Sequence, residues 1–200
     1  MKKIGFFGGS FDPIHMGHLN LAIQLLEKKG LDQILFCPAL LSPTKQDHPP
    51  HVSPEHRMNM LRLSLEDVPG CEPYEAELMR PPPSYTIDTI KRLQGNKIYL
   101  ILAEDAAYGL DQWKDSEELL DLAPPLIGTR FGFDNEKLNR LPEKIKLKVQ
   151  EGMCQISAMD ISSTHVRERL KKRLYCGHLL QGKVLDYIHQ NGLYSNNFKS

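Results

Sequence analysis

Short apolar runs alternate with amphipathic segments along the chain. The run at residues 2–8 ends in glycines, and residues 17–29 carry apolar side chains at helical spacing. Gly30 is expected to cap that helix, and residues 33–37 read as a second, buried strand. Strand, glycine turn, helix and strand in this order predict a βαβ unit, and therefore a parallel sheet.

The same alternation continues to the end of the sequence. The predicted strands are 71–78 (weakly patterned), 97–103 (KIYLILA, the clearest), 126–129 and 153–158, and the predicted helices begin at Pro54 and cover 85–93, 115–122, 163–174 and 182–190. Together these elements predict an α/β fold with a Rossmann-like, doubly wound parallel sheet and closing C-terminal helices. Ligands bind such a sheet in the crevice at the carboxyl ends of its strands.

Three local expectations accompany this fold. Residues 38–54 are rich in Pro and His and are expected to form a long binding loop. Asp115 with Glu118 three positions later predicts a capping box. Residues 134–151 are charged and weakly patterned, so we expect them to be peripheral. With no internal repeat and no linker, residues 1–200 are expected to form a single domain.

Composition and charge then exclude several classes of protein. The chain has 200 residues, with 25 basic and 25 acidic side chains and a formal net charge of +0. A protein that coats nucleic acid or an acidic membrane needs an excess of positive charge, so neither partner is expected. No apolar run approaches the roughly 20 residues of a membrane span, and the first seven residues lack a signal-peptide cleavage site.

The four cysteines are far apart and form no C-x-x-C pair: Cys37, Cys71, Cys154 and Cys176. Neither a disulfide framework nor a zinc knuckle is therefore predicted. We expect buried thiols in a cytoplasmic protein.

The first candidate chemistry follows the first strand, in the string G-G-S-F-D-P-I-H-M-G-H at residues 8–18. Its glycines let the backbone approach a ligand, and the helix N-terminus near Gly17 offers N–H groups to an anion. His15 and His18 can face one side and donate hydrogen bonds to a negatively charged transition state. Gly17 between them is expected to leave room for a phosphate.

Other interpretations of this string are less favourable. A plain turn with helix-capping histidines explains a glycine pair but not the whole string. A zinc site at H-x-x-H lacks a third ligand nearby. The string is neither a G-x-G-x-x-G fingerprint nor a P-loop, since no G-K-[ST] follows.

The second candidate follows the last predicted strand, in the string I-S-S-T-H-V-R at residues 161–167. In the plain interpretation, Ser and Thr only cap the helix that begins here. A helix N-terminus with three hydroxyls and an arginine one turn later is also a good seat for pyrophosphate. The two ends of the chain therefore each supply a helix start that could point into one crevice.

Together, H-M-G-H and I-S-S-T-H-V-R resemble the H-x-G-H and I-S-S-T-x-x-R signatures of the nucleotidylyltransferase superfamily. Within it, the sequence is similar to the bacterial nicotinate mononucleotide adenylyltransferases nearly end to end. The string S-Y-T-I-D-T at residues 84–89 and Trp113 select this branch. Further matches are residues 8–13, the loop at 42–45, Arg57 with Met58, Asp105 and residues 192–194.

The resemblance implies transfer of AMP from ATP to nicotinate mononucleotide, which gives nicotinate adenine dinucleotide and pyrophosphate in NAD biosynthesis. The acceptor phosphate would attack the α-phosphorus in line, without a covalent intermediate. Catalysis would then depend on positioning and on charge stabilisation. Mg²⁺ would arrive with the ATP rather than in a protein cage, so no protein metal site is expected. A homo-oligomer remains open.

The resemblance also assigns roles to individual residues. The implied catalytic residues are His15, His18 and Arg167, with His18 nearest the α-phosphate. The implied ATP-binding residues are Gly8, Gly9, Ser10, Phe11, Asp105, Ile161, Ser162, Ser163 and Thr164. The implied acceptor-binding residues are Lys45, Tyr85, Thr86 and Trp113. Trp113 would stack on the pyridine ring, and the backbone N–H of Thr86 would bind the carboxylate.

Several positions depart from the family pattern. Ala103 replaces a glycine, and its methyl group is expected to crowd the adenosine site. Thr44 replaces a loop histidine, Lys114 an aromatic residue, and Gln181-Gly182 stands where a proline is common. His48, His51 and His56 are expected to be loop and surface histidines.

Three alternatives stay open. Phosphopantetheine adenylyltransferases use the same chemistry, but they usually have Thr where this chain has His15 and lack the string at 84–89. Nicotinamide mononucleotide could replace the nicotinate acceptor, because backbone donors decide between them. A catalytically inactive nucleotide sensor is disfavoured by the intact His15, His18 and Arg167.

Overall fold

The computed structural model describes the chain except for residues 42, 44–48, 94, 130–133, 158 and 196–200. Its centre is a six-stranded sheet with the strand order β3-β2-β1-β4-β5-β6, and every neighbouring pair is parallel. The strands are β1 (Lys3–Gly9), β2 (Gln33–Pro38), β3 (Cys71–Pro73), β4 (Lys97–Ala103), β5 (Pro125–Thr129) and β6 (Met153–Gln155). The order reverses between β1 and β4, which is the switch point where such sheets bind ligands. The predicted Rossmann-like, doubly wound sheet is confirmed.

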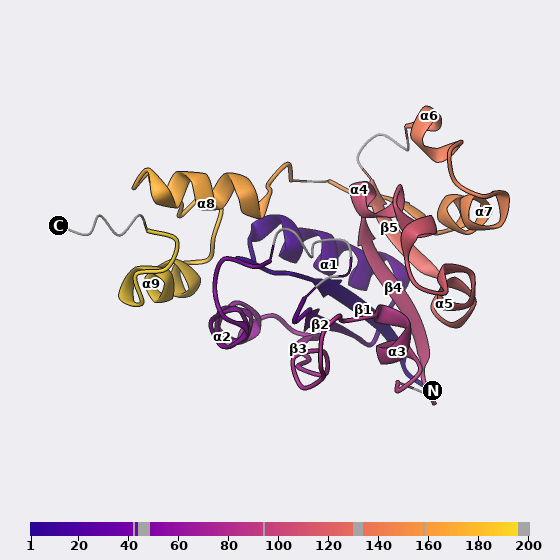
Figure 1. The fold of residues 1–200 in the computed structure, drawn as a ribbon, viewed down its shortest axis with the longest axis horizontal. Helices are drawn as coiled ribbons and strands as arrows, with labels where there is room; N and C mark the ends of the chain where they lie inside the picture. Colours follow the sequence, from indigo (N-terminus) through magenta and orange to yellow (C-terminus); the bar gives the residue numbers. More distant parts are fainter. Residues whose placement is uncertain (42, 44–48, 94, 130–133, 158, 196–200) are drawn as a thin grey trace.

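Helices cover both faces of the sheet (Figure 1). One face packs against α1 (Met16–Lys29), α2 (Pro54–Leu65), α8 (Ser163–Lys171) and α9 (Gly182–Gln190). The other face packs against α3 (Thr86–Ile90), α4 (Glu104–Ala107), the 3-10 turn η2 (Leu110–Gln112), α5 (Ser116–Leu122), α6 (Asn135–Leu138) and α7 (Glu143–Glu151). The alternation of side chains along β1 separates the two cores, with Phe7 on the first face and Phe6 on the second.

The ends of α1 form as the sequence predicts. His15 is its N-cap residue, and Gly30 ends it in the left-handed conformation with φ 58°. A left-handed residue at this position favours glycine because other side chains are strained there. The helix therefore starts within the string at residues 8–18, which is the first of the two predicted phosphate motifs; the string at 161–167 is the second.

Two local expectations are wrong: the peripheral position of residues 134–151 and the capping box at Asp115. Residues 134–151 form α6 and α7, and Leu138, Ile145 and Val149 are buried in the second core. These apolar side chains attach the two helices to the core, although most of the other residues in them are exposed. Asp115 precedes α5 with φ 48° and its side chain makes no capping bond, so the predicted capping box does not form.

Two predicted strands are shorter than expected. β3 stops at Pro73, and β6 stops at Gln155. Beyond β6, the carbonyl of Ser157 accepts hydrogen bonds from the side-chain amides of Asn20 (2.8 Å) and Gln24 (3.0 Å) on α1. The chain is therefore turned from the sheet toward the start of α1 before α8 begins.

All four cysteines are buried thiols, as predicted. None of the described helices combines the length and the apolar character that crossing a bilayer requires.

Candidate active site

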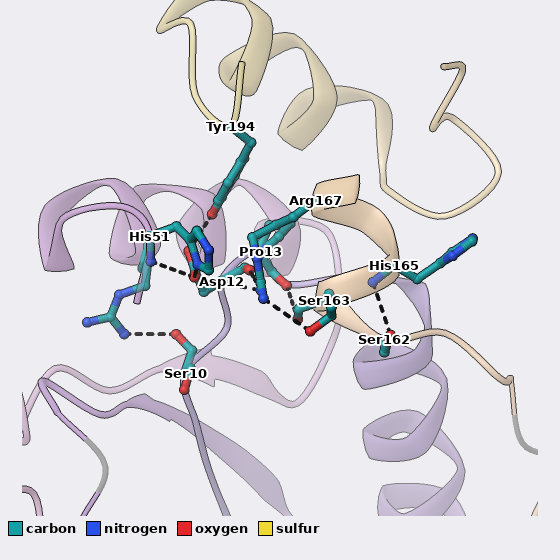
Figure 2. Close-up of polar contacts among 11 residues, drawn as sticks. Ser10, Asp12, Pro13, His51, Ser162, Ser163, His165, Arg167 and Tyr194 are labelled. Carbon is teal, nitrogen blue, oxygen red and sulfur yellow. Dashed lines mark hydrogen bonds and ion pairs between the residues drawn. The ribbon is translucent and has the colours of Figure 1, made fainter. Parts of the chain in front are cut away.

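The turn after β1 and the start of α8 are hydrogen-bonded to each other (Figure 2). Ser163 Oγ donates to the carbonyl of Pro13 at 2.9 Å, and Arg167 Nη1 donates to the carbonyl of Asp12 at 2.6 Å. Ser162 caps α8, since its Oγ accepts the N–H of His165 at 3.1 Å. The Ser163–Pro13 and Arg167–Asp12 bonds join residues at least 150 positions apart in the sequence. The structure thus brings the two phosphate motifs together at the carboxyl end of β1.

The two histidines stack on each other at the start of α1. Their ring centroids are 3.6 Å apart with an interplanar angle of 23°, and the backbone N–H of His15 donates to His18 Nδ1 at 3.2 Å. A neutral His18 ring therefore carries its proton on Nε2. Burial lowers the pKa of His15 to about 4, so this ring is neutral at pH 7.

Close packing explains two glycines of the first motif. A Cβ on Gly9 would lie 3.1 Å from the ring of Phe11, which itself packs edge-on against His18 at 5.1 Å. A Cβ on Gly17 would lie 3.1 Å from His15 Nδ1 and 3.4 Å from Ile161 Cβ. The space beside Gly17, predicted to admit a phosphate, is instead filled by His15 and Ile161. Gly17 lets the two motifs approach each other.

Two of the residues predicted to bind the acceptor, Tyr85 and Thr86, lie at the start of α3. Ser84 is buried, its Oγ accepts the N–H of Leu40 at 3.0 Å, and its own N–H donates to the carbonyl of Leu41 at 3.0 Å. Tyr85 is the N-cap residue and Thr86 the first residue of the helix. The string at 84–89 is thereby fixed to the loop that follows β2. Lys45, predicted to meet the acceptor phosphate, lies outside the described residues, as do Ser42, Thr44 and His48.

Trp113 is half-buried against the second core. Its neighbour Lys114 lies 4.5 Å from the ring centroid of Tyr85 and 3.4 Å from Asp88 Oδ1. These contacts bring the segment around Trp113 to the start of α3. Lys114, which departs from the family pattern, thus links two segments that are predicted to bind the acceptor.

At the end of β4, Asp105 is exposed in the first turn of α4. Its neighbour Glu104 is partly buried and accepts hydrogen bonds from Tyr108 Oη and from Thr129 Oγ1, both at 2.8 Å. Ala103 is half-buried as the N-cap residue of α4. The crowding of adenosine by its methyl group stays a prediction.

Arg57 has a positioning role that the sequence did not indicate. Its side chain is fully buried, and Nη1 donates to the carbonyls of Ser10 and Ala39, both at 2.8 Å. It thereby joins the glycine turn to the loop after β2. An arginine among the apolar positions of α2, next to Met58, was the available signal.

Thr89, from the string at 84–89, is fully buried in α3. Its Oγ1 donates to Glu77 at 3.0 Å and accepts from Arg80. Burial raises the pKa of Glu77, while the contacts with Thr89 and Arg80 oppose that rise. The last threonine of the string therefore stabilises the segment that leads into α3.

Within the described residues, no three His, Cys, Asp or Glu side chains are grouped so that they could hold a metal ion.

Comparison with known proteins decides the family. The model of the Cytidylyltransferase-like family matches residues 6–169. The nicotinate-nucleotide adenylyltransferase of Bacillus subtilis is 34% identical over 200 residues, which cover 98% of this chain and 100% of that protein. The "Probable nicotinate-nucleotide adenylyltransferase" of Carboxydothermus hydrogenoformans is 36% identical over 198 residues, covering 96% and 98%.

This chain belongs to the nicotinate-nucleotide adenylyltransferase family. The solved structure of Plasmodium falciparum nicotinic acid mononucleotide adenylyltransferase complexed with NaAD has the same fold as this chain. The two are 22% identical with a TM-score of 0.75, over 97% of this chain and 98% of that one. The family predicted from the two phosphate motifs is confirmed.

Proposed function

We propose that this protein transfers the adenylyl group of ATP to nicotinate mononucleotide, giving nicotinate adenine dinucleotide and pyrophosphate. The observation that carries the proposal is the direct hydrogen bonding of the two phosphate motifs, through Ser163 to Pro13 and Arg167 to Asp12. Relatives that cover nearly the whole chain carry the name of this activity. One structural neighbour is described as complexed with NaAD, the product of the proposed reaction.

The reaction needs no nucleophile from the protein. An oxygen of the acceptor phosphate forms a bond to the α-phosphorus of ATP, and the bond from that phosphorus to the bridging oxygen of pyrophosphate breaks. Because the attacking phosphate is already an anion, the protein contributes alignment and charge stabilisation.

The first motif would stabilise the reacting phosphate. His18 is held against His15 and Phe11, and its Nδ1 is used by the backbone of His15. The Nε2–H is the donor that we assign to the α-phosphate. Neutral His15 would support this ring by stacking, and the N-terminus of α1 adds its positive end.

The second motif would hold the leaving group. The N-terminus of α8 would supply backbone N–H groups and the hydroxyl of Thr164, while Ser162 caps the helix and Ser163 fixes it to Pro13. Arg167 Nη2 donates to Thr164 Oγ1 at 3.1 Å, so the guanidinium lies beside that hydroxyl. Mg²⁺ would enter as part of the ATP substrate and neutralise charge on the triphosphate.

The acceptor would bind between the start of α3 and the tryptophan segment. The backbone N–H groups at the N-terminus of α3, including that of Thr86, would suit a carboxylate. Trp113 and Tyr85 would supply aromatic faces for the pyridine ring. A carboxylate at a helix N-terminus favours nicotinate over nicotinamide, because only the acid carries the negative charge.

Pyrophosphate release tests the proposal. The pure protein with ATP and Mg²⁺ is mixed with nicotinate mononucleotide, nicotinamide mononucleotide or phosphopantetheine in parallel. We expect pyrophosphate release to be fastest with the nicotinate acceptor. Faster release with phosphopantetheine would move the protein to the rival class, and ATP binding without pyrophosphate from any acceptor would indicate a sensor.

A further inference from the structure

One buried carboxylate beneath the phosphate motifs has no part in the proposed chemistry. Asp12 is only 3% exposed and is contacted from several directions (Figure 2). Tyr194 Oη donates to Oδ1 at 2.8 Å, while the backbone N–H of His51 donates to Oδ2 at 2.8 Å and His51 Nδ1 lies 3.2 Å from it. Arg167 Nη1 lies 3.7 Å from the same Oδ2.

The distance between Arg167 and Asp12 is long for an ion pair. A charge-assisted N–H···O bond is about 2.7–2.9 Å long, whereas these atoms are 3.7 Å apart and Nη1 is bonded to the backbone carbonyl of Asp12 instead. Attraction between the two charges would strengthen if the carboxylate moved closer. The guanidinium would then be more fully neutralised by the protein and less available to a bound phosphate.

Tyr194 occupies the other oxygen of this carboxylate. Its side chain is buried in the first core beside α9, and its residue is 8% exposed. Burial and the nearby charge of Asp12 raise the pKa of the Tyr194 phenol far above its usual range. The hydroxyl therefore keeps its proton and remains a donor to Oδ1.

We propose that Tyr194 is a positioning residue for the pyrophosphate end of the site. Its hydroxyl on Oδ1, together with the backbone N–H of His51 on Oδ2, fixes the rotation of the Asp12 carboxyl group and keeps that group from closing onto Arg167. The charge of Arg167 thus stays available to the departing pyrophosphate. The inference rests on the proposed function, which assigns Arg167 to that anion.

The test compares Tyr194→Phe with Tyr187→Phe. Both changes remove a tyrosine hydroxyl from the C-terminal region. Tyr187 Oη accepts from Asn59 Nδ2 at 3.0 Å and is hydrogen-bonded to His56 Nδ1 at 2.9 Å, but these contacts do not involve Asp12. Tyr187→Phe is therefore a matched control for weakened docking of this region.

Affinity for inorganic pyrophosphate, measured by calorimetry, is the deciding quantity. We expect Tyr194→Phe to weaken it about fivefold, because Asp12 would then neutralise part of the Arg167 charge that otherwise attracts the anion. Tyr187→Phe should leave it unchanged, and neither variant should change the KM for nicotinate mononucleotide. Equal pyrophosphate affinity in Tyr194→Phe and the wild type, or equal weakening in both variants, overturns the inference.

Asp12→Asn should change the affinity for pyrophosphate in the opposite direction. Removing the carboxylate charge facing Arg167 should tighten pyrophosphate binding, and Tyr194→Phe should then have little further effect on it. The full fivefold effect in the Asp12→Asn background would contradict the inference; if that background does not fold, the comparison of the two tyrosines decides. A wild type that binds pyrophosphate but forms no dinucleotide overturns the proposed function, while the affinities still decide the role of Tyr194.

Discussion

At the residue scale, the first phosphate motif depends on side chains that fix one another. His18 is held by the backbone of His15, by stacking on the His15 ring and by the edge of Phe11. We expect His18→Ala to lower the rate of pyrophosphate release about 100-fold or more, because one donor to the developing charge is lost, while the protein remains folded.

His165→Ala is the matched control for that change. His165 is exposed in the first turn of α8, within the second motif, and its backbone N–H rather than its ring makes the capping contact with Ser162. The control should keep its rate, measured in the same pyrophosphate assay. Equal losses in both variants would remove His18 from its assigned role.

The buried ring of His15 also predicts how stability depends on pH. Its pKa is about 4 when folded, against 6.5 for the exposed group, so the unfolded chain binds more protons between these values. The contribution of His15 is complete above pH 6.5 and is lost as the pH falls toward 4, by up to about 3 kcal/mol. Unfolding in urea at pH 7 and pH 5 should show a smaller loss for His15→Asn than for the wild type. An equal loss in both would contradict this assignment.

At the scale of elements, the glycine turn after β1 and the loop after β2 are held together by α2. Arg57 donates from one buried guanidinium nitrogen to Ser10 and to Ala39. Arg57→Lys should destabilise the fold by about 2–3 kcal/mol, because a compact, strongly hydrated ammonium group costs more to bury and cannot reproduce the position of Nη1 between the two carbonyls. Arg62→Lys, on the same helix but at an exposed pair with Glu75, should change the free energy of unfolding by less than about 0.5 kcal/mol. Urea denaturation measures both, and equal effects would refute the role of Arg57.

Elements with strong apolar periodicity were predictable, and those shaped by long-range contacts were not. The run at 97–103 forms β4 with the predicted bounds, since a continuous apolar run with turns on both sides has few alternatives. β6 ends early because Asn20 and Gln24 of α1 bind the chain beyond it. Similarly, the two phosphate motifs could be found in the sequence. The bonds of Arg57 to Ser10 and Ala39, and of Tyr194 to Asp12, could not, because they depend on which groups the fold brings near.

At the scale of the whole molecule, a bound phosphate chain would bridge two helix starts from opposite ends of the sequence. Pyrophosphate at about 100 times its Kd should stabilise the fold by about 2.7 kcal/mol, which corresponds to a rise in Tm of about 5–10 °C for a chain of this length. Arg167→Gln should lose most of this shift, whereas Lys171→Gln, an exposed change of the same charge on α8, should keep it. Thermal unfolding with and without pyrophosphate checks this. A full shift in Arg167→Gln would contradict the role of the arginine.

The hydrogen bond from Tyr194 to Asp12 spans 182 positions of the sequence. During synthesis on the ribosome, the histidine pair leaves the exit tunnel early, but the neighbouring Asp12 carboxylate receives the phenol only after the further 182 residues up to Tyr194 have emerged. A nascent polypeptide stalled before α9 would therefore carry the first phosphate motif without the hydrogen bond from Tyr194 to Asp12.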